Sequence, residues 1–188
     1  DVSLNGFVGT GGSVCIVLES EEEALRRGVE PYAEFLGWGQ ASDGHNVAIS
    51  HPEGRGLRDA MLRALKDADL PPEAIDYANA HAPSTPIGDA SELKALRSVF
   101  PEPQRLRLSS TKALTGHGLS LSSIMEAAFC CLALKDGFLP GSANVREPDP
   151  ELGHLRLLRA TIDEQVDRIL SNSSGFGGAN VSLLFQKS

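Results

Sequence analysis

Short apolar segments alternate along this chain with segments whose apolar residues recur at helical spacing. Residues 75–80 and 106–109 have the length and composition of buried strands. Residues 53–69 and 86–100 repeat apolar side chains every three or four positions, and prolines follow the first of these two segments. Alternation of this kind is typical of one α/β domain.

The remaining segments extend the same alternation. Residues 13–19 are short, apolar and β-branched, which predicts a buried strand after a glycine-rich turn. Ser20 is the expected N-cap of a short helix that ends at Gly28. The other expected elements are a strand over 31–40, a long buried helix over 119–135, and strands over 168–172 and 180–185.

Charge and cysteine content exclude several classes of protein. Asp and Glu number 25 against 17 Lys and Arg, and the net charge of −8 disfavours a nucleic-acid binder. No apolar run reaches the roughly 18 to 20 residues of a membrane span. Cys15, Cys130 and Cys131 form neither a disulfide framework nor a CxxC metal site, so we expect three core cysteines, no metal, and a reducing, cytoplasmic location.

His81 opens the loop HAPSTPIGD directly after a predicted strand, and Asp89 lies in the first turn of the next helix. Loops at the carboxyl ends of strands are where α/β folds place reactive side chains. The alternative is a helix-capping loop with an incidental histidine, and this segment by itself supports both interpretations equally.

The segment SSTKALTGHGLSLSSIME places Lys112 five residues before His117, and Glu126 on the apolar helix that follows. A buried carboxylate is costly unless it is paired, and Lys112 is the nearest plausible partner in sequence. A cation beside a histidine disfavours the imidazolium form. The alternative is a helix-capping turn with a solvated lysine.

Phe176 stands between Gly175 and Gly177 in the segment SNSSGFGGAN. Glycines permit unusual backbone angles and bring main-chain N–H groups close to a ligand, so the loop is a candidate oxyanion donor or aromatic gate. The alternative is a tight turn with a core phenylalanine. A second glycine-rich segment, residues 6–12, precedes a predicted strand instead of joining strand to helix, which disfavours a nucleotide-binding loop.

Taken in order, these segments resemble the C-terminal part of the β-ketoacyl-acyl-carrier-protein synthases. IDYANAHAPSTPIGD is similar to the family's IDY-x-NAHGTSTPxGD, SSTKALTGH to SSTKxxTGH, and LSNSSGFGGANVSLLF to LSNSFGFGGxNxSLVF. GFVGTGGSVCIVLE resembles a further family strand, so the resemblance covers essentially the whole chain. It implies an α/β, thiolase-like fold, with residues 1–30 as the last strand and helix of the N-terminal half and residues 31–188 as the C-terminal half.

The resemblance implies a decarboxylative Claisen condensation of malonyl-acyl carrier protein with an enzyme-bound acyl group. His81 and His117 are then the active-site histidines, and Lys112, supported by Glu126, tunes their electrostatic environment. The other implied roles are Asp89 supporting the His81 loop, Phe176 as oxyanion donor and gate between Gly175 and Gly177, and Thr85 binding the phosphopantetheine arm. No further cofactor and no metal are expected.

Three departures from the family pattern stand out. Ala82 and Pro83 replace Gly and Thr of HGTST, and Pro83 loses a hydroxyl and an N–H. Ser120, Leu121, Ser122 and Ser123 replace GAAG, and Leu121 adds bulk that is expected to reshape the acyl or pantetheine tunnel. Ser174 replaces the first Phe of FGFGG. These changes favour a specialised synthase of polyketide or polyene biosynthesis over a housekeeping fatty-acid enzyme.

The nucleophilic cysteine of the family lies upstream of anything matching Asp1. We therefore expect an upstream N-terminal ketosynthase segment or chain as a partner, together with acyl carrier protein and a homodimer or a ketosynthase/chain-length-factor heterodimer. Retention of His81, Lys112 and His117 favours an enzyme. The altered loops favour the alternative, a non-catalytic subunit resembling a chain-length factor.

Overall fold

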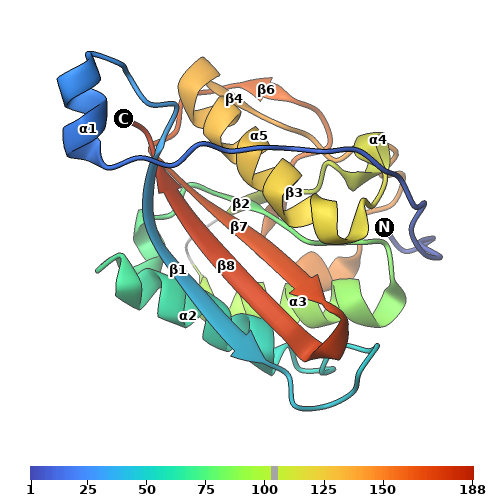
Figure 1. Ribbon diagram of the computed structural model, residues 1–188. Helices are drawn as coiled ribbons and strands as arrows, with labels where there is room; N and C mark the ends of the chain where they lie inside the picture. The colour runs from blue at the N-terminus through green and yellow to red at the C-terminus, as the bar shows by residue number, and fades with distance from the viewer. Residues whose placement is uncertain (103–105) are drawn as a thin grey trace.

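A six-stranded mixed sheet forms the centre of the computed structural model, which describes residues 1–102 and 106–188 (Figure 1). The strand order is β1-β8-β7-β2-β3-β5. Strands β7, β2, β3 and β5 run parallel, and β1 and β8 add to them as antiparallel neighbours. The bounds are β1 Glu34–Ser42, β2 Tyr77–Asn79, β3 Arg107–Ser109, β5 Arg156–Leu157, β7 Arg168–Gly175 and β8 Ala179–Gln186.

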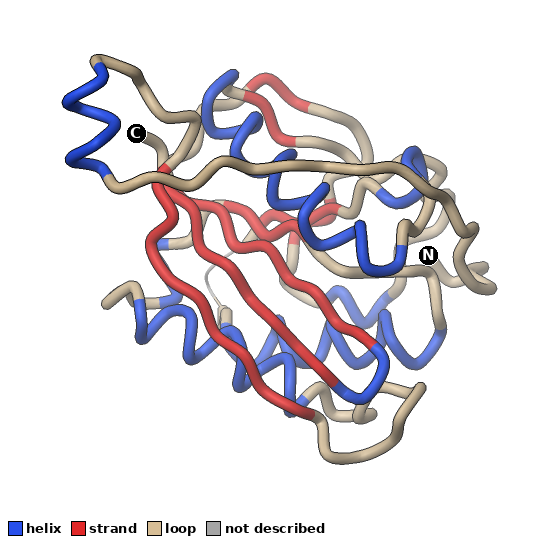
Figure 2. Tube along the Cα trace, in the orientation of Figure 1, coloured by secondary structure: helices blue, strands red, loops and turns tan. Residues whose placement is uncertain are grey.

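Helices cover both faces of this sheet (Figure 2). Helices α2 and α3 bury one apolar cluster against the sheet, and α5 buries a second cluster on the opposite face. The helices are α1 Glu21–Arg27, α2 Arg55–Asp67, α3 Pro86–Val99, α4 Lys112–Thr115 and α5 Ser122–Asp136. Short 3-10 turns cover Pro72–Ala74, Leu119–Leu121, Pro150–Leu152 and Phe176–Gly178, and β4 Phe138–Leu139 pairs with β6 Ile162–Asp163.

Local sequence signals located most elements. Ser20 accepts a hydrogen bond from the backbone of Glu23 and begins α1, and Gly28 ends it in the left-handed conformation with a φ of 67°. The strands predicted over 31–40, 75–80 and 106–109 are observed as β1, β2 and β3, within a few residues at each end. The helix expected from 119 begins at Ser122, after a 3-10 turn. The two-residue strands β4, β5 and β6 were not predicted.

The strand predicted over 13–19 is wrong. This segment runs extended across the α5 side of the molecule, and Val17 and Leu18 are 81% and 76% exposed. Cys15 is exposed, so its expected place in the core is also wrong. The physical reason is that no strand in the described residues pairs with this segment, and a strand needs a hydrogen-bonded neighbour to bury its side chains.

The other two cysteines lie on α5, where Cys130 is buried and Cys131 is partly exposed. Burial raises the pKa of both thiols, which makes neither a ready nucleophile at neutral pH. In the described part of the chain, none of the helices combines the length and apolar character that a bilayer span requires.

Candidate active site

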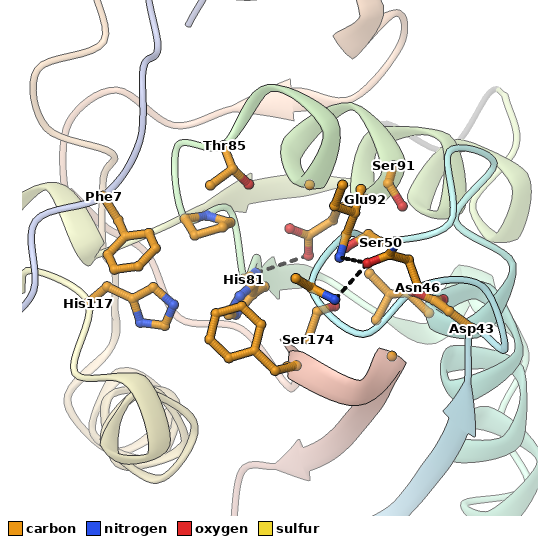
Figure 3. Close-up of a pocket in the computed structure, with 18 of the residues that line it drawn as sticks. Phe7, Asp43, Asn46, Ser50, His81, Thr85, Ser91, Glu92, His117 and Ser174 are labelled. Atoms are coloured by element: carbon orange, nitrogen blue, oxygen red, sulfur yellow. Dashed lines mark hydrogen bonds between the residues drawn. The ribbon is translucent and has the colours of Figure 1, made fainter.

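The carboxyl ends of three adjacent parallel strands bring the candidate residues together. His81 follows β2, Lys112 and His117 follow β3, and Phe176 follows β7. Parallel strands place these ends at one edge of the sheet, and this edge borders a cavity of about 470 Å³ (Figure 3). His81, Thr85, His117, Gly175 and Phe176 line that cavity.

The two histidine rings meet inside the cavity. Their centroids are 5.3 Å apart and the rings are nearly perpendicular, and both residues are buried. Burial lowers the pKa of His81 well below its usual value, and the charges of Lys112 and His117 act in the same direction. Burial and Lys112 also lower the pKa of His117. Both imidazoles are therefore neutral at neutral pH.

Lys112 and Glu126 form a buried ion pair through Nζ and Oε1, as the spacing on the apolar helix predicted. Neither side chain is solvated, which excludes the alternative of a surface lysine at this turn. Burial raises the pKa of Glu126 to about 7, against the opposing effect of Lys112. Lys112 is not one of the residues that line the cavity, so it acts on the histidines through its charge.

The carboxylate that holds the His81 loop most directly is Glu92, which the sequence analysis missed. The backbone N–H groups of His81 and Ala82 donate to its two oxygens at 2.9 and 2.7 Å. Asn172 adds a hydrogen bond of 3.3 Å. Glu92 lies one helical turn after Asp89, and this spacing on the buried face of α3 is the signal that could have identified it.

Asp89 also supports this loop, at the end of the loop formed by Thr85. Its Oδ1 accepts a hydrogen bond of 3.0 Å from the backbone of Thr85. Burial and the neighbouring Glu92 charge raise the pKa of Asp89 to about 6. The loop between His81 and Thr85 has a strained backbone, because Ala82 and Ser84 have positive φ angles of 26° and 68°.

The glycine-rich turn presents Phe176 to the cavity. Phe176 is 74% exposed, which excludes the alternative of a core phenylalanine in a tight turn. Gly177 and Gly178 have φ angles of 79° and 75°, in the region that favours glycine. The backbone of Gly177 donates to the carbonyl of Val47 at 2.7 Å, which ties the turn to the loop after β1.

The departures from the family pattern occupy different places. Pro83 and Ser174 line the cavity. Ser174 donates a 2.7 Å hydrogen bond to Asn180, whose amide donates to Asp43. Leu121 does not line this cavity; its side chain lies against Gly118 instead.

The N-terminal segment forms one wall of the site, which the sequence analysis did not anticipate. Phe7 lines the cavity, and its ring lies edge-on to His117 with centroids 4.7 Å apart. The backbone of His117 donates to the Val8 carbonyl at 2.8 Å, and Thr10 donates to the His117 carbonyl at 3.1 Å. This pairing across 110 residues has no local sequence signal.

Residues 32–146 match the family model described as the C-terminal domain of β-ketoacyl synthase. The chain belongs to the β-ketoacyl synthase family. The mitochondrial 3-oxoacyl-acyl-carrier-protein synthase of Arabidopsis thaliana is 45% identical over 98% of this chain and 41% of its own length. Synthase 1 of Escherichia coli K12 is 40% identical over the whole chain and 45% of its own length.

Solved ketosynthase structures share the fold. One match is the structure of a type II PKS acyl-carrier protein in complex with its ketosynthase bound to the hexaketide. Its TM-score is 0.95 and its sequence identity is 28%, and the match covers 100% of this chain and 46% of the matched chain. The ishigamide ketosynthase/chain length factor matches with a TM-score of 0.94 and 32% identity over the same shares. These matches confirm the predicted α/β, thiolase-like fold. The β-ketoacyl synthase chain spans less than half the length of these relatives.

Proposed function

We propose that this chain is the two-histidine part of a β-ketoacyl-acyl-carrier-protein synthase that catalyses decarboxylative Claisen condensation. The observation that carries the proposal is the pair of buried imidazoles in contact at one cavity, beside the Lys112–Glu126 ion pair. The names of the relatives support the reaction class, since they are 3-oxoacyl-acyl-carrier-protein synthases.

In this proposal His81 and His117 donate hydrogen bonds to the thioester oxygen of the malonyl group. The malonyl carboxylate leaves as carbon dioxide, and its electron pair becomes an enolate whose charge the two donors stabilise. The enolate carbon attacks the carbonyl carbon of an acyl group on a cysteine that another part of the synthase supplies. The new carbon–carbon bond forms as the cysteine thiolate leaves. Neutral imidazoles suit this role. Burial lowers the pKa of both histidines, and the charge of Lys112 adds to that effect.

The substrates reach the site on the phosphopantetheine arm of acyl carrier protein, with no further cofactor and no metal. Thr85 lines the cavity and is the proposed contact for this arm. Phe176 is proposed to gate the site, and its backbone N–H to complete the oxyanion hole beside the cysteine that another part of the synthase supplies. In the assembled enzyme, residues 1–30 belong to the N-terminal ketosynthase half and residues 31–188 belong to the C-terminal half. The assembled enzyme is proposed to be a dimer located in the cytoplasm.

A chain-length-factor-like subunit is the second candidate. Two observations favour it: Pro83 removes a hydroxyl from the cavity wall, and one matching structure is a ketosynthase/chain length factor. In that case catalysis belongs to the partner subunit of a heterodimer, in polyketide or polyene synthesis. The enzyme remains the preferred proposal because His81, Lys112 and His117 are all retained and assembled.

The test is malonyl-acyl-carrier-protein decarboxylation by the complete synthase. His81→Ala and His117→Ala should each reduce the rate by about 10²–10³, the usual effect of removing one preorganised donor. Acylation of the cysteine should persist, because the proposed donor at Phe176 is main chain. His45→Ala is the matched control, since this histidine is exposed and does not line the cavity. Unchanged decarboxylation in both active-site variants would assign catalysis to another chain.

A further inference from the structure

The cavity extends beyond the two histidines to a second end, which is polar. Figure 3 shows Asn46 and Ser50 on the side of the cavity away from Phe7 and His117. These two side chains come from the loop that joins β1 to α2, and Ser174 lines the cavity next to the glycine-rich turn. We call Asn46, Ser50 and Ser174 the polar end of the cavity. No step of the condensation proposed above uses these three side chains.

Three hydrogen bonds hold the loop between β1 and α2 against the rest of the site. Asp43 accepts a 3.0 Å hydrogen bond from the backbone of His51, and the His51 carbonyl accepts one of 2.8 Å from Ser91 of α3. The carbonyl of Val47 accepts the third from the backbone of Gly177. The polar end is therefore a built part of the cavity, between this loop and the glycine-rich turn.

The hydrogen bonds of Asn46 determine which of its atoms remains for a ligand. Its Oδ1 accepts from the backbone N–H groups of Ala48 and Ile49 at 2.8 and 3.2 Å. Because a backbone N–H only donates, the amide has one orientation, and Nδ2 remains as a donor with two hydrogens. Ser50 lines the same cavity and makes no side-chain hydrogen bond among the described contacts, so its hydroxyl is a second donor.

Ser174 supplies an acceptor at the same end of the cavity. Nδ2 of Asn180 donates to Asp43 and to the Gly178 carbonyl, both at 3.0 Å, so Oδ1 is the atom of Asn180 that faces Ser174. The Ser174 hydroxyl donates to that oxygen at 2.7 Å and keeps only its lone pairs for a ligand. The family pattern has phenylalanine at this position, so the substitution also removes a ring from the cavity wall.

We propose that the polar end of the cavity binds a hydroxyl or keto oxygen carried on the substrate chain. The proposal rests on the proposed function and names its substrate class, which is an oxygenated acyl chain instead of a saturated one. A saturated chain would displace water from Asn46, Ser50 and Ser174 without replacing the lost hydrogen bonds, which is costly. An oxygen on the chain accepts from the two donors, so the site selects the chain that carries it.

The experiment measures condensation by the complete synthase with primers of equal length on acyl carrier protein. One primer is saturated, and the others carry a hydroxyl or keto oxygen at C3 or C5. The quantity compared is kcat/KM for each oxygenated primer divided by kcat/KM for the saturated one. Asn46→Asp keeps the oxygen that holds the loop and replaces the Nδ2 donor, and Ser50→Ala removes the hydroxyl. Asn144→Asp and Ser123→Ala are the matched controls, because both residues are exposed and lie outside the cavity.

The parent should favour an oxygenated primer, and Asn46→Asp and Ser50→Ala should each lower the ratio about three- to tenfold. Asn46→Asp should affect the keto primers more than the hydroxyl primers, because a keto oxygen cannot donate to the new carboxylate. Ser174→Phe, which restores the residue of the family pattern, should shift the preference towards the saturated primer. The two control variants should leave the ratio unchanged. A parent that favours the saturated primer, or an unchanged ratio in both Asn46→Asp and Ser50→Ala, would overturn the proposal.

A binding measurement separates this proposal from the proposed function. Calorimetry with pantetheine amides of the same chains, which contain no cleavable thioester, measures the preference of the complete synthase without turnover. Tighter binding of the oxygenated amides together with no condensation of any primer would keep the polar subsite and reject the proposed function. Condensation of all primers together with equal affinity for all amides would reject the subsite and keep the proposed function.

Discussion

The two buried charged side chains of Lys112 and Glu126 control the electrostatics of this site. Lys112 and Glu126 lie in the protein interior, where removing one partner leaves the other uncompensated. Burial nevertheless raises the pKa of Glu126 to about 7, so the pair carries both charges only above that pH. The folded protein therefore holds this proton at pH values where the unfolded chain has already lost it. As a result, the free energy of unfolding decreases as the pH rises towards the pKa of the folded state.

Lys112→Met should therefore destabilise the protein in a pH-dependent way. Without the lysine, the pKa of Glu126 rises further, and the loss of stability relative to the parent grows above pH 7 by up to about 1.4 kcal/mol per pH unit. Thermal unfolding of the complete synthase at pH 6, 7 and 8.5 measures this difference. Lys112→Met combined with Glu126→Gln should show no such growth, and equal losses at all three pH values would contradict the argument.

The two histidines predict the acid limit of activity. The pKa of each is lowered, so each stays neutral at pH values where a solvent-exposed histidine is already protonated. Decarboxylation should stay constant from pH 7.5 to 6.5 and fall only below that range. Lys112→Met should move the fall to higher pH, because the cation that disfavours the imidazolium is gone. A parent profile that already falls above pH 6.5 would contradict the assigned pKa direction.

At the scale of elements, the contact between β1 and α2 depends on two strand glycines. A Cβ at Gly39 would lie 2.0 Å from the Ala60 carbonyl oxygen, and one at Gly37 would lie 2.9 Å from the Ala68 nitrogen. Both obstacles are helix backbone, which cannot move as a side chain can. The absence of side chains at Gly37 and Gly39 of β1 thus sets how closely α2 approaches the sheet.

Gly39→Ala should cost about 3 kcal/mol or more, since α2 would have to move away from the sheet. The loss of thermal stability is the measurement. Gly11→Ala is the control, because nothing lies within 4 Å of a Cβ there and its φ is not positive. A Gly39→Ala protein as stable as Gly11→Ala would show that the helix and strand separate at little cost.

The whole molecule leaves large apolar side chains in solvent. Val17 and Leu18 of the extended N-terminal segment are exposed, as is Trp38 of β1, a strand at the edge of the sheet. Exposed apolar surface and an unpaired sheet edge favour association. The matching relatives are more than twice as long as this chain, and their additional residues are the proposed cover for these surfaces.

The isolated chain of 188 residues should therefore self-associate or aggregate. Sedimentation velocity at increasing concentration should show species well above its 20.0 kDa mass, and co-expression with the N-terminal part of the synthase should suppress them. Val17→Ser combined with Leu18→Ser should weaken the association. A stable 20 kDa monomer at all concentrations would show that these surfaces need no partner.

Local patterns in the sequence were sufficient where a few neighbouring residues decide the structure. The serine and glycine that bound α1, and the apolar repeats of α2 and α3, act through hydrogen bonds and packing within a few turns. The Lys112–Glu126 pair was also predictable, because a carboxylate on an apolar helix is costly unless it is paired and Lys112 was a plausible partner in sequence.

Tertiary structure alone decided the features that depend on distant segments. Residues 13–19 have strand composition but find no neighbour to pair with in the described chain, so they remain extended and exposed. Phe7 reaches His117 only because the backbone around Val8 pairs with the histidine turn, and Glu92 reaches His81 because α3 packs behind the loop. Strand pairing and burial are properties of both partners, and the composition of one segment cannot specify the other.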